Sequence, residues 1–122
     1  MTAALTLIEV TLVVAVLMAL IGTLFIGAAS YSEGSSRARC LLTLSNVQKA
    51  VRSYQNFYDL APGNSLSSTA IIGTGKLIET APACGSGGSY TYGTTIPATG
   101  TAYMSCSLAA TRSHVAANLT GW

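Results

Sequence analysis

A single carboxylate, Glu9, lies near the start of an apolar run that extends from Leu5 to Ala29. A helix of about 20 apolar residues is long enough to cross a lipid bilayer. A charge within such a segment is energetically unfavourable unless a partner neutralises it, so such charges usually have a function. Glu9 therefore either is tolerated near the helix end, by protonation or snorkelling, or pairs with a buried cation.

Three cysteines, Cys40, Cys84 and Cys106, can tie the chain together. A disulfide between Cys84 and Cys106 closes the shortest loop and contributes about 3 kcal/mol in the chain-entropy model. Cys40 paired with either of them would instead tie a helix to a sheet, and the sequence leaves the connectivity open. Because the cysteines are far apart along the chain and His114 is the only histidine, no metal-ligand spacing is visible. We expect no metal and no cofactor, and we expect His114 to be an ordinary surface or hairpin-side residue.

The sequence holds few residues that could catalyse a reaction. No close pair of carboxylates, Ser-His-Asp set or phosphate-binding loop is visible, so we expect no enzyme and no small-molecule substrate. After Asp59 the only acidic residue is Glu79, which is too few oxygen ligands for a calcium loop. Asn118-Leu119-Thr120 is a glycosylation sequon, a short motif of low specificity that makes Asn118 a candidate site.

The residues that could do chemistry are positioned by a long helix. The apolar run does not end in a breaker, and the amphipathic pattern that starts at Cys40 continues at helical spacing. Its apolar positions are Leu41, Leu44, Val47, Val51, Tyr54 and Tyr58. We predict one helix from about Leu5 to Tyr58, about 80 Å long at 1.5 Å per residue. The aromatic residues at its end, Tyr54, Phe57 and Tyr58, are expected to pack in the core beside a sheet rather than to form a ligand site.

The remaining chain is predicted to form a small head. The turn residues 59–64 end the helix, and Ser65–Ile72 predicts a short helix capped by Asn64 or Ser65. Ser89–Tyr92 and Thr101–Cys106 are rich in strand-forming residues and predict a hairpin, with a third short strand near His114–Ala117. The predicted organisation is an apolar helix over 1–30, its amphipathic continuation over 31–58, and a β-containing head over 59–122.

Composition and charge restrict the function classes. The chain has 122 residues, of which 50% are hydrophobic and 8% charged, with a net charge of +2. Its basic residues are scattered, whereas a nucleic-acid binder clusters them on one face. All six basic residues follow the apolar run, which by the positive-inside rule favours a cytoplasmic head. The cysteines and the polar, charge-poor head favour an oxidising compartment, and a basic leader preceding Met1 would remove this conflict.

The segment Leu5-Thr6-Leu7-Ile8-Glu9-Val10, followed by the apolar run, resembles the N-terminus of type IV pilins and pseudopilins. In that family an aromatic-Thr-Leu-Ile-Glu segment opens the mature chain, and the glutamate is its fifth residue. Thr6 to Glu9 match, and Leu5 stands where phenylalanine or methionine is usual. The resemblance implies an α+β pilin fold, in which the long N-terminal helix packs on a small antiparallel sheet.

The resemblance also implies an assembly role for Glu9. In the family this glutamate sets the axial stagger of subunits, and a neighbour's α-amino group is the natural partner for it in a filament core of apolar helices. The mature chain begins at Leu5 or at Met1, and we favour Met1. A start at Met1 places Glu9 about one helical turn further from the N-terminus than a start at Leu5 does.

Small residues within the apolar helix suit close packing of helices. Gly22 and Gly27 are also its weakest helix formers, each about 1 kcal/mol less favourable than alanine. Related filaments often have an unwound helix at such glycines, so any melted segment is expected within Gly22–Gly34. A continuous helix is the alternative.

Together these features predict a structural subunit, the major pilin of an extracellular type IV pilus-like filament for adhesion, motility or surface contact. Its implied partners are other copies of itself, the prepilin peptidase and N-methyltransferase, and the assembly machinery of the inner membrane, where the chain resides before assembly. The alternatives are a pseudopilin of a type II secretion system and a DNA-uptake competence pilin. The scattered basic residues disfavour nucleic acid as a partner.

Overall fold

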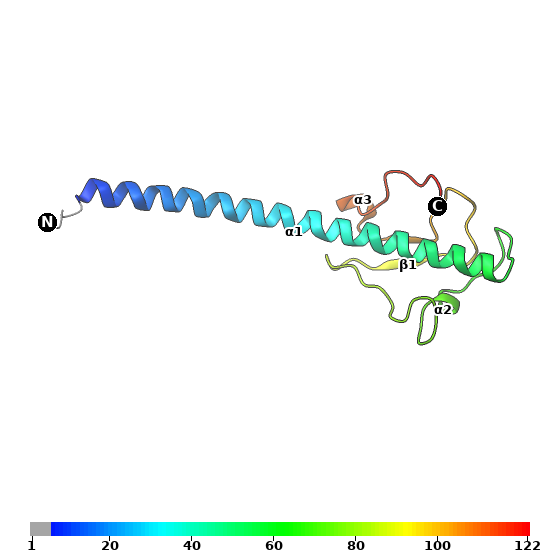
Figure 1. The fold of residues 1–122 in the computed structure, drawn as a ribbon. Helices are drawn as coiled ribbons and strands as arrows, with labels where there is room; N and C mark the ends of the chain where they lie inside the picture. Colours follow the sequence, from blue (N-terminus) through cyan, green and yellow to red (C-terminus); the bar gives the residue numbers. More distant parts are fainter. Residues whose placement is uncertain (1–5) are drawn as a thin grey trace. The chain divides into compact units, whose positions relative to one another are not determined.

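A computed structural model describes residues 6–122 of the chain. Helix α1 runs from Leu7 to Phe57 (Figure 1). The chain divides into two compact units, Met1–Gly34 and Ser35–Trp122, and we call the second unit the head. The amphipathic part of α1 therefore belongs to the same unit as the residues that follow it. Met1 and Leu5, the two candidates for the mature first residue, lie outside the described residues.

Helix α1 begins two residues later than the sequence predicts, because Thr6 caps it. The Thr6 side-chain oxygen accepts a hydrogen bond from the Glu9 backbone N–H at 3.3 Å. The Thr6 carbonyl accepts the first intrahelical bond from Val10. Thr6-x-x-Glu9 is the spacing of a capping box, in which an acidic or amide side chain stands at the third helical position. Glu9 thus lies where a negative charge interacts favourably with the helix dipole.

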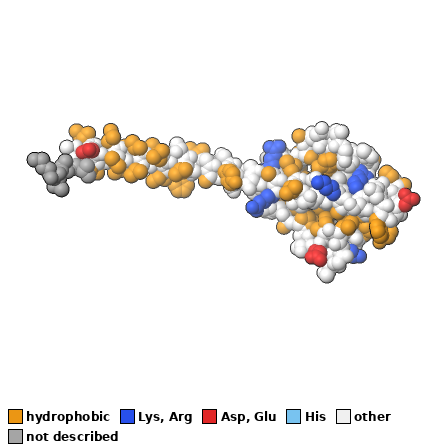
Figure 2. Space-filling model, viewed as in Figure 1, with side chains coloured by type: hydrophobic (Ala, Val, Ile, Leu, Met, Phe, Trp, Pro, Cys, Tyr) orange, Lys and Arg blue, Asp and Glu red, His pale blue; other side chains and the backbone are white. Residues whose placement is uncertain are grey.

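The described part of the first unit buries nothing within the chain. Every residue from Thr6 to Ser32 is exposed, including the large side chains of Leu24, Phe25 and Ile26. Figure 2 shows hydrophobic side chains along this segment. An 18-residue window of α1 has a mean hydropathy of 2.6 and is 0% buried. By length and composition α1 can therefore cross a membrane, and its apolar surface is not accounted for by packing inside this chain.

The helix is continuous across the segment in which the sequence allows melting. Gly22, Gly27 and Gly34 all lie inside α1. In this single chain the continuous alternative therefore holds, and local unwinding in an assembled filament stays a prediction.

Besides its part of α1, the described head contains two short helices and a two-stranded sheet. Helix α2 spans Ser68–Ile71, strand β1 spans Tyr90–Tyr92, strand β2 spans Met104–Cys106, and helix α3 spans Ala109–Arg112. The strands are antiparallel, with Tyr90 opposite Cys106 and Tyr92 opposite Met104. The layout is α+β, with the predicted hairpin confirmed over fewer residues than expected.

The core of the head forms where the apolar face of α1 meets the loops and the sheet. Its central members are Cys40, Leu44, Val47, Val51, Leu66, Ile71, Ile96, Tyr103 and Met104, with Cys84 and Cys106 beside them. Burying such side chains stabilises the fold by about 25 cal/mol for each Å² of apolar surface removed from water. The predicted helical face is thus confirmed at Leu44, Val47 and Val51.

Three local predictions were wrong. Among the aromatic residues at the end of α1, Tyr54 packs against the core, but Phe57 is 82% and Tyr58 is 56% exposed. The core ends about one helical turn before them. Helix α2 is capped by Ser67, whose side chain accepts from the Thr69 N–H, rather than by Asn64 or Ser65.

The third predicted strand is absent from the described chain. Residues 114–117 form an irregular segment that follows α3. Ser113, at the end of α3, has a left-handed conformation with φ 56°. Ser113 therefore redirects the chain just before this segment.

Two polar side chains of α1 hold the irregular parts of the head. The buried Gln48 amide donates to the Thr101 carbonyl at 3.0 Å and accepts from the Tyr103 N–H at 2.9 Å. The Arg52 guanidinium donates to the carbonyls of Pro97 at 2.8 Å, Ala98 at 3.1 Å and Trp122 at 3.0 Å. Loops with few backbone ladders are therefore fixed to the helix by side chains.

Replacing Arg52 with alanine is expected to lower the free energy of unfolding of the head by about 1–3 kcal/mol, because three carbonyls lose a charged donor. Unfolding of the full chain in detergent micelles can be followed by the fluorescence of Trp122, the single tryptophan. Lys49→Ala is the matched control, since Lys49 is an exposed cation of the same helix. Equal stability of the two variants would contradict this role of Arg52.

Candidate functional site

Four side chains that can ligate a metal meet inside the head. Cys40, Cys84, Cys106 and His114 are all buried, and their ligand atoms all lie within 4.8 Å of one another. The Cys84 sulfur lies 3.6 Å from His114 Nδ1 and 3.9 Å from the Cys106 sulfur. The Cys106 sulfur lies 4.0 Å from His114 Nδ1. We call these four residues the Cys–His cluster.

Each member of the Cys–His cluster comes from a different element. Cys40 lies on the buried face of α1, one turn before Leu44. Cys106 is the last residue of β2. Two members of the cluster therefore lie where the helix and the sheet pack together.

Local turns supply the other two members. Cys84 opens a turn in which its carbonyl accepts from the Gly87 N–H at 3.3 Å, and Gly87 has φ 78°. His114 follows the left-handed Ser113, and its N–H donates to the Leu108 carbonyl at 3.3 Å. The turn after α3 thus brings a fully buried imidazole to the cysteines.

Backbone N–H groups surround two of the sulfur atoms. The Leu108 N–H donates to the Cys106 sulfur at 3.4 Å. At Cys84, burial acts to raise the pKa of the thiol, but the backbone N–H groups of Ser86 and Gly88, and then His114 and Cys106, outweigh it and lower the pKa to about 7. Hydrogen bonds donated to a thiolate favour the charged form.

At Cys40 burial dominates instead. Burial raises the pKa of its thiol to about 11, and the neighbouring Cys106 and Cys84 add to the rise, although Tyr90 opposes it. The Tyr90 hydroxyl is buried near the side chains of Cys40 and Thr43, and it makes no hydrogen bond of good geometry within the described chain. Burial and then Cys40 raise the pKa of Tyr90. A buried hydroxyl without a partner is unfavourable, and here it lies next to a sulfur atom.

The packing at the cluster is tight around Gly88. A Cβ built there would lie 3.0 Å from Leu108 side-chain atoms and 3.2 Å from the Cys106 sulfur. A larger residue at this position would therefore require the Leu108 side chain or the Cys106 sulfur to shift.

The cluster changes the interpretation of the cysteines and of His114. The expectation that His114 is an ordinary surface or hairpin-side residue was wrong, because its side chain is 0% exposed and lies among the three cysteines. The cysteines are distant along the chain but adjacent in space, so separation in sequence does not exclude shared ligation. All three are thiols in this structure, and the 3.9 Å between Cys84 and Cys106 sulfurs exceeds the disulfide bond length of about 2.05 Å.

The other predicted site residues lie outside this cluster. Glu9 is exposed in the first turn of α1, and Gly22 and Gly27 are exposed further along it. Asn118 is exposed near the C-terminus, where its side-chain oxygen accepts from the Thr120 N–H at 2.8 Å. Its exposure leaves the sequon accessible.

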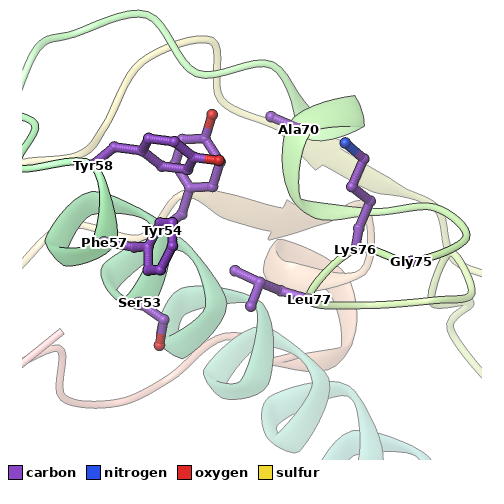
Figure 3. A pocket seen from close by; sticks show the side chains of 8 residues that line it. All are labelled: Ser53, Tyr54, Phe57, Tyr58, Ala70, Gly75, Lys76 and Leu77. Atoms are coloured by element: carbon purple, nitrogen blue, oxygen red, sulfur yellow. The ribbon is translucent and has the colours of Figure 1, made fainter.

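A groove of about 470 Å³ lies between the end of α1 and the loop after α2. Tyr54, Phe57 and Tyr58 line one side, and Lys76 and Leu77 come from the loop (Figure 3). The Tyr54 and Tyr58 rings contact each other with centroids 4.5 Å apart. Lys76 is the only charged residue among those lining this groove, so the groove holds no convergent set of reactive groups.

Comparisons with protein-family models, with curated proteins and with solved structures find no match to this chain.

Proposed function

We propose that this chain is the structural subunit, the major pilin, of an extracellular type IV pilus-like filament. It would insert in the inner membrane through residues of α1 and then enter a helical homopolymer in which these helices form the core. The prepilin peptidase, the N-methyltransferase and the pilus assembly machinery would be its partners before assembly. The filament would serve adhesion, motility or surface contact.

The observation that carries this proposal is the exposure of the whole described apolar segment from Thr6 to Ser32. An apolar surface of this extent requires either lipid or other protein chains to cover it. A subunit that moves from a membrane into a filament core needs both environments in turn. A simple membrane anchor needs only lipid, and in it Glu9 would serve only the start of α1.

The glycines of α1 also support packing against other chains. A Cβ added at Gly22 or at Gly27 would meet no atom within 4 Å other than the neighbouring backbone of α1 itself. Each glycine weakens the helix by about 1 kcal/mol relative to alanine, so the isolated chain gains nothing from them. Close approach of a neighbouring helix, or local unwinding during assembly, would explain both.

Electron microscopy of material sheared from the cell surface tests this proposal. The full chain is produced in a bacterium that carries a type IV pilus assembly machinery and lacks its own major pilin. Long filaments whose subunit mass matches this chain are expected, and the mass also identifies the first residue and any N-methylation. Absence of filaments, with the chain retained in the membrane, would contradict the proposal and favour a secretion pseudopilin.

The same filaments distinguish the DNA-uptake alternative. A filament that serves adhesion or motility is expected to bind duplex DNA no more than an unrelated filament does. Binding that falls steeply with added salt would identify phosphate contacts and would favour a competence pilin instead.

A further inference from the structure

We propose that Cys40, Cys84, Cys106 and His114 bind one Zn²⁺ ion as a closed, four-coordinate structural site in the head. This inference rests on the Cys–His cluster alone and does not depend on the proposed filament. Three cysteines and one histidine are a common donor set of structural zinc sites.

The spacing of the donor atoms fits a single tetrahedral ion. With Zn–S bonds of about 2.3 Å and Zn–N bonds of about 2.05 Å, a tetrahedron separates two sulfurs by about 3.8 Å and a sulfur from a nitrogen by about 3.6 Å. The Cys84 and Cys106 sulfurs are 3.9 Å apart, and His114 Nδ1 is 3.6 Å from the first and 4.0 Å from the second. No pair in the cluster exceeds 4.8 Å, so small adjustments of Cys40 would complete the coordination.

The surroundings of the cluster suit metal-bound thiolates. Three thiolates and a neutral imidazole around Zn²⁺ leave one net negative charge in a buried site. The Leu108 N–H donates to the Cys106 sulfur at 3.4 Å, and the turn that Cys84 opens places the backbone N–H groups of Ser86 and Gly88 near its sulfur, so both can offset this charge. Such outer contacts orient and stabilise metal ligands in known sites.

The unpartnered Tyr90 hydroxyl supplies a further argument. It is buried beside Cys40 without a hydrogen bond of good geometry. A Cys40 thiolate bound to zinc would accept its proton in a hydrogen bond, which gives the hydroxyl a partner. The residue that looks unsatisfied without the ion is therefore explained by it.

A disulfide explains less of the geometry. It would join two of the sulfurs and leave the third as a buried thiol, with the imidazole Nδ1 that faces both Cys84 and Cys106 as a neighbour rather than a ligand. Zinc uses all four groups, and it ties α1, the Cys84 loop, β2 and the segment after α3 at one point. Zinc binding converts the thiols to thiolates and releases their protons to solvent, so no oxidant is required.

Metal analysis of the full chain tests the proposal. The chain is extracted from membranes in detergent without reductant, dialysed against a weak chelator, and measured by elemental analysis and intact mass. One zinc per chain is expected, with the mass of three reduced cysteines. Iron in place of zinc, or a mass lower by two hydrogens from a disulfide, would overturn the zinc assignment.

A second measurement does not depend on any variant folding. Anaerobic titration of the metal-free wild-type chain with Co²⁺ is expected to give the visible absorption bands of a tetrahedral thiolate site. Added Zn²⁺ should displace the Co²⁺ and abolish these bands. The Cys84→Ser and His114→Ala variants are expected to bind zinc with an affinity lower by about tenfold or more. Met104→Leu removes a buried sulfur outside the cluster and should retain full zinc. Absence of the Co²⁺ bands in a folded wild-type chain would contradict the proposal.

Tyr90→Phe gives the most discriminating prediction. Loss of the hydroxyl should weaken zinc affinity by about 10- to 100-fold, while the metal-free chain keeps or gains stability because an unpartnered buried group is removed. Competition titration with a chromophoric chelator measures the first effect, and thermal melting without metal measures the second. Tyr92→Phe on the same strand is the control and should leave zinc affinity unchanged. A Tyr90→Phe chain with wild-type affinity would remove this part of the argument.

Discussion

Cells that produce the Glu9→Gln chain are expected to assemble few or no filaments while inserting the chain in the membrane normally. In the proposed filament the Glu9 carboxylate pairs with a neighbour's α-amino group in an apolar core. Removing one partner of a buried ion pair costs about 3–5 kcal/mol, since the other charge stays buried and unpaired. That loss weakens subunit association by about a hundredfold or more. Counting filaments and measuring the membrane-bound chain in the same cells gives both quantities.

Glutamine is the informative substitution at this position. The Thr6 oxygen accepts from the backbone N–H of residue 9, and glutamine suits the third position of a capping box as well as glutamate does. Glu9→Gln therefore removes the charge but leaves the start of α1 intact. Glu9→Ala would remove both the charge and the side chain suited to the capping box.

The control for Glu9→Gln is the same substitution at a carboxylate outside the apolar helix. Glu79 is exposed in the head, so Glu79→Gln changes the net charge equally and should leave filament yield unchanged. Normal yield from Glu9→Gln would show that Glu9 is only tolerated near the helix end. Such a result would contradict the role of Glu9 alone, because filament formation itself is tested with the wild-type chain.

Stripping zinc from the head is expected to abolish its cooperative unfolding transition near room temperature. Structural zinc sites contribute apparent binding free energies of about 10–16 kcal/mol in small peptides, and whole domains are stable by only about 5–15 kcal/mol. The sheet of the head has two strands of three residues each, so backbone pairing contributes little. Without the ion, three buried thiols and an imidazole would occupy the centre where four segments meet.

Thermal melting in detergent, with and without a strong chelator, measures this effect. Near-ultraviolet circular dichroism reports packing in the head, while part of the far-ultraviolet helix signal should persist because residues 7–34 lie in the other compact unit. Cys84→Ser should melt identically with and without chelator. A wild-type chain with the same melting temperature in the presence and absence of chelator would contradict a structural role for the metal.

The comparison of sequence with structure is clearest along α1. The continuous apolar run and the helical spacing from Cys40 predict the helix to within two residues at each end, because helix formation depends on local pattern. The hairpin is also predicted, since its strands are local runs of strand-forming residues. The buried state of Gln48 could have been suspected from its place beside Val47 and Val51, but its partners Thr101 and Tyr103 are distant in sequence.

Exposure at the end of the helix could not be predicted in this way. Phe57 and Tyr58 continue the spacing of the buried face, yet both are exposed. Periodicity reports which side of a helix is apolar, but not how far along it the rest of the chain extends. Only the packing of the head determines where the core stops.

The sequence by itself determined the long helix, its exposed apolar segment and the carboxylate at Glu9, because these depend on neighbours in the chain. Only the tertiary structure decided that three cysteines and His114 share one buried site. Their contacts span 30, 22 and 8 residues, and no local spacing records them. The turn at Ser113 and the approach of the Cys84 loop to β2 are products of packing, and packing is what brings four separate donors within reach of one ion.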